Sequence, residues 1–414
     1  MILETEETRV FHDLDSAKNL IRDLEATENW TNAEKSSSRS GEVVDCPIIP
    51  DMFTNAPMPD VNLNEKNGVT YPSLEGGKVF RISENDREAM AEAMRESRMV
   101  VGYKESTPYS EFKPHPLALS ALPSLTAQAG YQHSPALVNI NGKGSQDAMR
   151  PELRSAIINE GLKIMKGTCQ VYTCDQMVRF VASKTYVPIK ISDLLEGLLS
   201  MLKKNYPSFS FETGFINHTF VDFRFSLNDE FLTKKLRNVL EQSGISGNHE
   251  PCIRFITSNT GDSGANLYPM LTNGVCFFAI EEPIKMEHLG EASVEKFKQN
   301  VEKAYAAFKV LPNRIDSLSR VPINNVKNCY LNVGAAANLP PKSYAESAEF
   351  FAQTYQSLVS ALDVYFYISE NFAEYAYNNK MSPIKQAQYE SNLARVFVDQ
   401  QKILECDSEA LIRP

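Results

Sequence analysis

Residues 252–290 constrain the fold of this chain more than any other segment. Residues 254–258 alternate apolar and polar side chains, and residues 274–280 are nearly all apolar, which predicts two strands, the second more deeply buried. A Gly-rich stretch separates them, and Asn273-Gly274 is typical of a tight turn. The segment therefore predicts strands in the middle of the chain, followed by a single histidine, His288.

The remaining patterns predict an α+β protein with a mixed or antiparallel sheet and packed helices. In residues 219–226 the alternation of apolar and polar side chains favours a sheet with one face covered. Further strands are predicted for residues 99–103, 168–173, 177–189 and 208–216, and helices for residues 16–27, 83–98, 152–166, 193–205, 229–242, 291–320, 343–377 and 383–401.

Composition divides the chain into three parts. Residues 1–79 are predicted to be an acidic, loosely structured N-terminal arm, because polar and Pro-rich stretches follow its one helix. Of the net charge of −10, most comes from residues 1–100, which hold 20 acids against 11 bases. Residues 80–320 are predicted to form the α+β core and residues 321–414 a helical region. If the protein has a protein partner, we expect the N-terminal arm to contact it.

Aromatic side chains in residues 343–377 would surround a single long helix on most sides. A helix that is apolar on several sides is either deep in a core or covered by another chain. We therefore expect a homo-oligomer.

Membrane and metal sites are not expected. No apolar run approaches the ~18 residues of a membrane span, and the acidic start is unlike a secretory signal, so a cytoplasmic protein is predicted. The seven cysteines are scattered and lack a zinc-binding spacing, so no metal or cofactor is expected.

No catalytic residues are predicted. Nucleotide-binding, metalloprotease and hydrolase motifs are absent. Cys276 and His288 are a conceivable nucleophile and base, but Cys276 lies in an apolar run, where a thiol is expected to be inert.

Four short motifs resemble those of a family of phage, prophage and plasmid proteins, the YafZ/YfjQ-like prophage proteins, whose domain has no agreed activity. The resemblance covers about residues 180–318 and departs at Leu271, often Cys in the family, and at Leu289, which separates His288 from its glycine. The motifs are Ser183-Lys184-Thr185-Tyr186, Ser258-Asn259-Thr260-Gly261, Thr272-Asn273-Gly274 and His288-Leu289-Gly290. The resemblance implies an origin in a mobile element and a bacterial host cell.

Polar residues around the two central strands allow two interpretations. Asn259 and Asn273 are residues that shape turns through side-chain hydrogen bonds to the backbone. Alternatively, a polar cluster at one end of the sheet holds a phosphate or a base edge. The cluster would comprise Ser258, Asn259, Thr260, Asn273 and His288.

Basic residues are interleaved with aromatic ones in the second quarter of the chain. Residues 143–204 hold ten bases against six acids. Phosphates are contacted by Lys and Arg, and unpaired bases stack on exposed aromatic rings. The candidate nucleic-acid-binding residues are Arg179, Lys184, Tyr186, Lys190, Lys203 and Lys204. The alternative is that the rings lie in the core and the charges are merely solvated.

These observations favour a non-enzymatic accessory protein of a mobile element that acts on nucleic acid. An oligomeric single-stranded DNA binder or annealer fits best. The alternative is a structural or host-defence-countering protein that binds other proteins, and an enzyme is the third option.

Overall fold

The computed structural model describes residues 2–3, 7–34, 44–45, 100–103, 113–132, 151–165, 167–245, 247–274, 276–279, 282–354, 359–408 and 410. Over these residues the chain is an α+β protein with antiparallel sheets and a helical C-terminal region, as predicted. The helix predicted for residues 83–98 lies outside the described residues.

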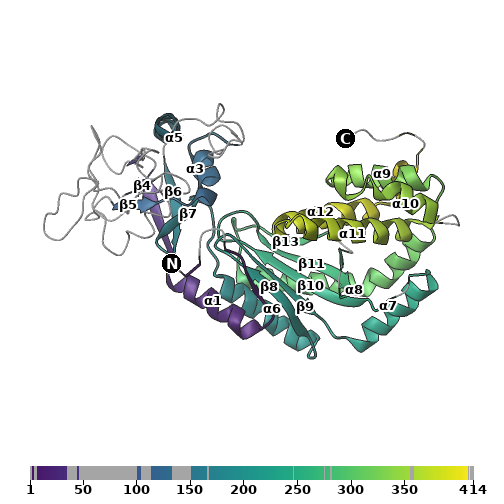
Figure 1. The fold of residues 1–414 in the computed structure, drawn as a ribbon. Coiled ribbons are helices and arrows are strands. Elements are labelled where there is room, and N and C mark those ends of the chain that lie inside the picture. Colours follow the sequence, from purple (N-terminus) through teal and green to yellow (C-terminus); the bar gives the residue numbers. More distant parts are fainter. Residues whose placement is uncertain are drawn as a thin grey trace.

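A seven-stranded antiparallel sheet forms the centre of the molecule (Figure 1). Its strand order is β1-β8-β9-β10-β11-β12, and β13 also pairs with β11. The strands are β1 (Arg9–Phe11), β8 (Ser210–Ile216), β9 (Val221–Ser226), β10 (Glu250–Thr257), β11 (Ala265–Thr272), β12 (Phe277–Ala279) and β13 (Ile284–Met286). The sequence does not predict β11, because Gly264 before it and Pro269 within it are typical of loops. Gly274, with a φ of +87°, confirms the predicted turn between β11 and β12.

A smaller antiparallel sheet lies beside the large one. It contains β2 (Asn29–Glu34), β6 (Thr168–Cys174) and β7 (Met177–Ser183). Helix α1 (Leu14–Ala26), capped by Asp13, leads from β1 of the large sheet to β2 of the small one. Residues 7–34 are therefore part of both sheets, and the prediction of a loose arm is wrong for them.

The small sheet has an apolar core of its own, in which Leu122, Leu125 and Val178 are buried. The surrounding elements are the 3₁₀ helix η3 (Leu119–Ala121), α3 (Leu122–Gln128), α5 (Pro151–Met165) and the short sheet of β3 (Val44–Asp45), β4 (Val100–Tyr103) and β5 (Lys113–Pro116).

Helices cover both faces of the large sheet (Figure 1). On one side lie α6 (Ile191–Asn205), α7 (Glu230–Gln242) and α8 (Val294–Ser319), and on the other α12 (Pro383–Val398). Helix α11 (Ala361–Asn378) packs against both α8 and α12 at the β12 edge. The remaining C-terminal elements are α9 (Val326–Ala336), η4 (Pro341–Ser343), α10 (Ser347–Thr354), α13 (Gln400–Cys406) and the paired strands β14 (Pro322–Ile323) and β15 (Val359–Ser360).

The long aromatic helix predicted for residues 343–377 is wrong. The segment contains two separate helices, α10 and α11, and Ser360 begins the second with a capping box to Asp363. Phe351, Tyr365 and Phe372 are at most 5% exposed, because other elements of the same chain cover them. Phe350 and Tyr377 of the same segment stay exposed, at 62% and 85%, so the oligomer stays a prediction that these two rings alone support.

The two faces of the large sheet differ in chemistry. Phe223 and Phe255 belong to the apolar core. There the Phe255 ring packs against the ring of Phe297 in α8, with their centroids 5.3 Å apart. Side chains alternate across a sheet, so their neighbours Asp222 and Arg254 lie on the opposite face. That face is also covered, by α12, and the prediction of a single covered face is wrong.

Arg254 is fully buried between the sheet and α12. Its Nε and Nη2 donate to the two carboxylate oxygens of Asp222 at 2.9 and 2.8 Å, and its Nη1 donates to Glu390 Oε2 at 2.7 Å. Nη2 also donates to the Pro383 carbonyl. Burial disfavours the charge of Arg254, but Asp222 and Glu390 outweigh it and raise the pKa of the guanidinium. The cluster fixes α12 on the sheet.

Candidate functional site between the two sheets

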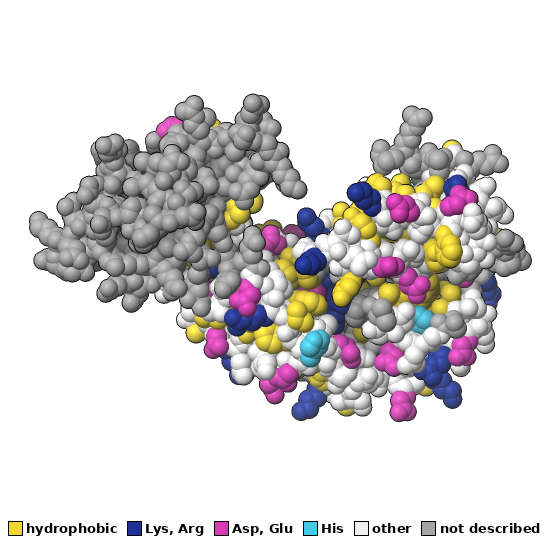
Figure 2. Space-filling model, in the orientation of Figure 1, with side chains coloured by type: hydrophobic (Ala, Val, Ile, Leu, Met, Phe, Trp, Pro, Cys, Tyr) yellow, Lys and Arg dark blue, Asp and Glu magenta, His cyan; other side chains and the backbone are white. Residues whose placement is uncertain are grey.

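A polar cleft of about 640 Å³ lies where the small sheet, the large sheet and α12 meet. The small sheet contributes Phe180, the loop after β10 contributes Asp262 and Ser263, and α12 contributes Gln388 and Arg395. In Figure 2 several Lys and Arg side chains lie near the middle of the view. Its volume lies within the usual range of ligand pockets.

The floor of the cleft is the turn that follows β10. The Ser258 hydroxyl accepts a hydrogen bond from the Thr260 backbone N–H at 3.0 Å, and the Thr260 hydroxyl lies 2.8 Å from Asp262 Oδ2. Ser258 and Thr260 are at most 5% exposed, so they shape the turn. Burial raises the pKa of the Asp262 carboxyl, which lines the cleft above them.

A stack of three rings joins the small sheet to the large one. Tyr186 lies between Trp30, at a centroid distance of 5.1 Å, and His288, at 5.4 Å. The backbone N–H of Val187 donates to the His288 carbonyl at 2.8 Å, which fixes the stack. The His288 ring lies 3.4 Å from the Thr257 hydroxyl, and burial lowers its pKa.

Glu28, which is half-buried, places its carboxyl beside this stack. It accepts hydrogen bonds from the Tyr172 hydroxyl at 2.6 Å and from the Asn259 amide at 3.1 Å. Burial raises the pKa of Glu28 in spite of these two donors. Asn259 therefore holds the turn after β10 against the start of the small sheet.

Two buried oxygen atoms of cleft-lining residues have no hydrogen-bond partner within the described part of the chain. They are the hydroxyl of Tyr186, which is 9% exposed, and Oδ1 of Asn266, which is 8% exposed. Buried polar groups in folded proteins almost always have a partner, and an unpaired one costs about 1–3 kcal/mol. Nδ1 of His288, another residue that lines the cleft, is likewise buried without a partner among the described residues.

The predicted nucleic-acid-binding residues do not form one surface. Lys184 is exposed, two residues from Tyr186, but Tyr186 itself is buried in the ring stack. Lys190 precedes α6, whereas Lys203 and Lys204 lie in its last turn, about 20 Å away along a helix of this length. Only Tyr186 of the predicted set lines the cleft.

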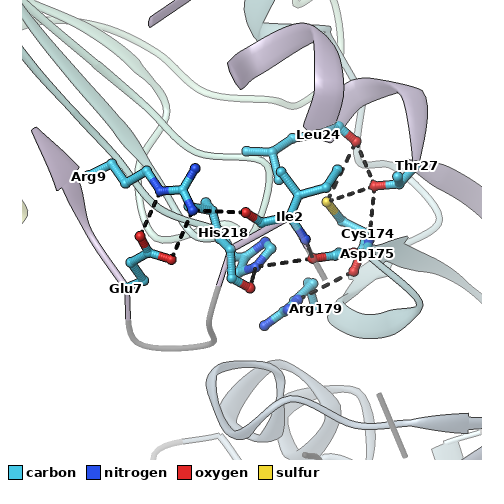
Figure 3. A network of polar contacts seen from close by, with 10 residues as sticks. Ile2, Glu7, Arg9, Leu24, Thr27, Cys174, Asp175, Arg179 and His218 are labelled. Carbon is cyan, nitrogen blue, oxygen red and sulfur yellow. Dashed lines mark hydrogen bonds and ion pairs between the residues drawn. The ribbon is translucent and has the colours of Figure 1, made fainter. Parts of the chain in front are cut away.

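Arg179 is fully buried, so it cannot contact a phosphate, and its assignment is wrong. Its Nε donates to the Cys174 carbonyl at 3.4 Å in the network of Figure 3. In the same network the backbone N–H of Ile2 donates to Asp175, and the His218 ring lies 3.1 Å from the Leu3 carbonyl. Burial, together with Arg179, lowers the pKa of His218 to about 4. These contacts join residues 2–3 to both sheets.

Four members of the predicted polar cluster lie together. Ser258, Asn259 and Thr260 follow β10, and His288 lies beside Thr257, the last residue of that strand. Asn273 follows β11 and lies at the opposite end of the sheet, where its side chain accepts from the Cys276 backbone N–H. The single cluster of five is therefore wrong. Cys276 is likewise remote from His288, and burial raises its pKa to about 11.

Several residues of the cleft are not predicted by the sequence. Asn266 is a polar residue near the start of β11, a strand that the sequence does not predict. Gln388 and Arg395 come from α12, more than 100 residues further along the chain. Of these additional cleft residues, only Asp262 and Ser263 could have been predicted from the sequence, because they lie directly after the predicted cluster.

Within the described residues, no group of three or more His, Cys, Asp or Glu side chains is placed to hold a metal ion. No helix in this part of the chain is long and apolar enough to cross a membrane. No protein-family model, curated protein or solved structure matches the chain. The resemblance to the prophage family stays a prediction.

Proposed function

We propose that the protein binds single-stranded nucleic acid in the cleft without catalysing a reaction. One observation carries the proposal, namely that the cleft combines an aromatic ring, Phe180, with two cations, Lys285 and Arg395, and with amide and hydroxyl groups. Proteins that bind unpaired strands use rings for the bases and cations for the backbone.

The charges around the cleft limit where a phosphate can lie. Arg395 is paired with Glu282 at 3.0 Å, and Asp262 and Glu287 also line the cleft. Lys285 and the exposed Lys184 are therefore the cations best suited to the strand. The acidic groups favour a site for a base rather than for several phosphates.

The resemblance to prophage proteins supports a wider setting for this activity. In that setting the protein is a mobile-element accessory protein in the cytoplasm of a bacterial host. The expected oligomer is tested by measuring the subunit number with light scattering after gel filtration, with and without single-stranded DNA.

The test is fluorescence anisotropy with a labelled single-stranded oligonucleotide of mixed sequence. Phe180→Ala should weaken binding by about 1–3 kcal/mol, because a base loses its stacking partner. Phe231→Ala is the matched control, since Phe231 is 81% exposed on α7, away from the cleft. It should bind as the unmodified protein does.

The cations are tested by the salt dependence of binding. Lys184→Ala combined with Lys285→Ala should flatten the slope of log affinity against log salt by roughly 0.7 for each phosphate that is no longer neutralised. Lys203→Ala with Lys204→Ala makes the same change in charge at the far end of α6 and should leave the slope unaltered. Absence of binding at a protein concentration of about ten micromolar and low salt would reject the proposal and favour a protein-binding role, because even non-specific binders retain nucleic acid under such conditions.

A further inference from the structure

We propose that the stack of Trp30, Tyr186 and His288 is a latch that acid releases. While it is closed, the latch holds the small sheet against the large one and so sets the width of the cleft. Tyr186 and His288 line the cleft themselves, so a change in the stack also changes the shape of the cleft. The proposal does not depend on which ligand the cleft binds.

The latch joins three separate parts of the chain. Trp30 lies in β2, Tyr186 follows β7, and His288 follows β13. The planes of neighbouring rings lie within 19° of each other, so the three rings are nearly parallel. Tyr186 also pairs with Leu289 in an isolated antiparallel bridge. Because the small sheet has an apolar core of its own, it can keep its fold when these contacts break.

His288 is the member of the latch whose charge can change near neutral pH. Its side chain is 4% exposed, and its polar neighbours, the Thr257 hydroxyl and the Val187 backbone, carry no charge. Burial lowers the pKa of His288, and the Val187 backbone offsets only part of this effect. An imidazolium is attracted to the face of a tyrosine ring, but this attraction is weaker than the cost of burying a charge without an ionic partner.

The charged groups around the stack do not replace such a partner. Glu28 and Asp262 act on the Tyr186 hydroxyl, one from the residue before β2 and the other from the turn after β10. Burial raises the pKa of both carboxyls, so they lose negative charge as the pH falls. The other charged residues nearby are exposed, and solvent screens them; they are Lys184, Lys285 and Glu287.

Acid therefore favours release of the latch. His288 binds a proton more weakly in the stack than in an open form, so opening takes up a proton. The latch has its full strength above the pKa of a free histidine, about 6.5, and weakens as the pH falls below that value. At neutral pH the latch stays closed.

The first experiment follows the fluorescence of Trp30, the only tryptophan of the chain, while circular dichroism monitors the fold. Between about pH 7.5 and pH 5 the emission of the unmodified protein should shift to longer wavelength with the dichroism unchanged, because Trp30 gains contact with water. His288→Phe keeps a ring that cannot take up a proton, so its emission should not shift. His288→Gln, which is smaller and also uncharged, should show no pH-dependent shift either. His12→Phe is the matched control, since His12 is exposed, and it should shift as the unmodified protein does.

The second experiment measures the width of the cleft by small-angle X-ray scattering. The radius of gyration of the unmodified protein should rise over the same pH interval, and that of His288→Phe should stay constant. A shift of the Trp30 emission at constant radius would overturn the proposal, because the stack would then open without moving the small sheet. An equal shift in His288→Phe, or none in the unmodified protein down to about pH 5, would also overturn it.

Discussion

Two groups of buried polar side chains lie between the large sheet and its neighbours, and they differ in how well they are satisfied. In the ion cluster, all three nitrogens of the Arg254 guanidinium donate to Asp222, Glu390 or Pro383. In the cleft, Asn266 and Tyr186 each keep an unpaired buried oxygen. A satisfied network stabilises a fold, whereas unpaired groups beside a cavity indicate a place for a ligand. The comparison separates a structural region from a candidate binding site.

The largest effect is expected in the ion cluster. Arg254→Met should lower the free energy of unfolding by about 3–5 kcal/mol, because it leaves Asp222 and Glu390 buried without their partner. Urea unfolding followed by circular dichroism measures the change. Arg320→Met is the matched control, since Arg320 forms an exposed pair with Asp316 that is worth less than about 1 kcal/mol. A similar cost for both variants would refute the structural role.

An intermediate effect is expected where the two sheets touch. Gly261 has a φ of +75°, and an added Cβ would lie 2.5 Å from the Phe180 ring. Gly261→Ala should therefore cost about 1–3 kcal/mol in thermal or urea unfolding. Gly244→Ala isolates the backbone contribution, because Gly244 has a φ of +82° but open space around its Cβ position. If both variants lose the same stability, the contact with Phe180 contributes nothing.

A smaller, pH-dependent effect is expected at Glu28. Burial raises its pKa in the folded protein, so the folded state binds the proton more tightly than the unfolded state does. Its contribution to stability is present at low pH and is lost as pH rises through the folded pKa. Glu28→Gln should therefore lose less stability than the unmodified protein when the pH rises from about 5 to about 7.5. Glu196→Gln, exposed on α6, should follow the unmodified protein.

The smallest effect is expected at Tyr186. Tyr186→Phe removes a buried hydroxyl that has no partner among the described residues, so it should change stability by only about 0–1 kcal/mol, toward greater stability. Tyr172→Phe removes a hydroxyl that donates to Glu28 and should destabilise by about 1–3 kcal/mol. Differential scanning calorimetry compares the two. A marked loss for Tyr186→Phe would mean that its hydroxyl is satisfied in solution.

The fold is easier to predict from this sequence than the cleft. Alternating side chains and turn residues predict β9, β10 and the Asn273-Gly274 turn, because those signals are local. In β7 the same alternation does not determine whether the Arg179 side chain faces water or the interior. In the structure Arg179 is buried. Asn266 and α12 line the same cleft only because the chain packs that way in three dimensions, and no local sequence pattern encodes that packing. Sequence reasoning thus finds the turn below the cleft but not the groups that line it.

The pairing of β1 with β8 has a consequence for synthesis on the ribosome. Arg9 pairs with Ile216, so the first strand is made about 200 residues before its neighbour in the sheet. At roughly 5–20 residues per second, β1 waits on the order of ten seconds or more for that neighbour. During that interval α1 has no strand of the large sheet other than β1 to pack against. A nascent chain halted before β8 should therefore be the form most in need of a chaperone.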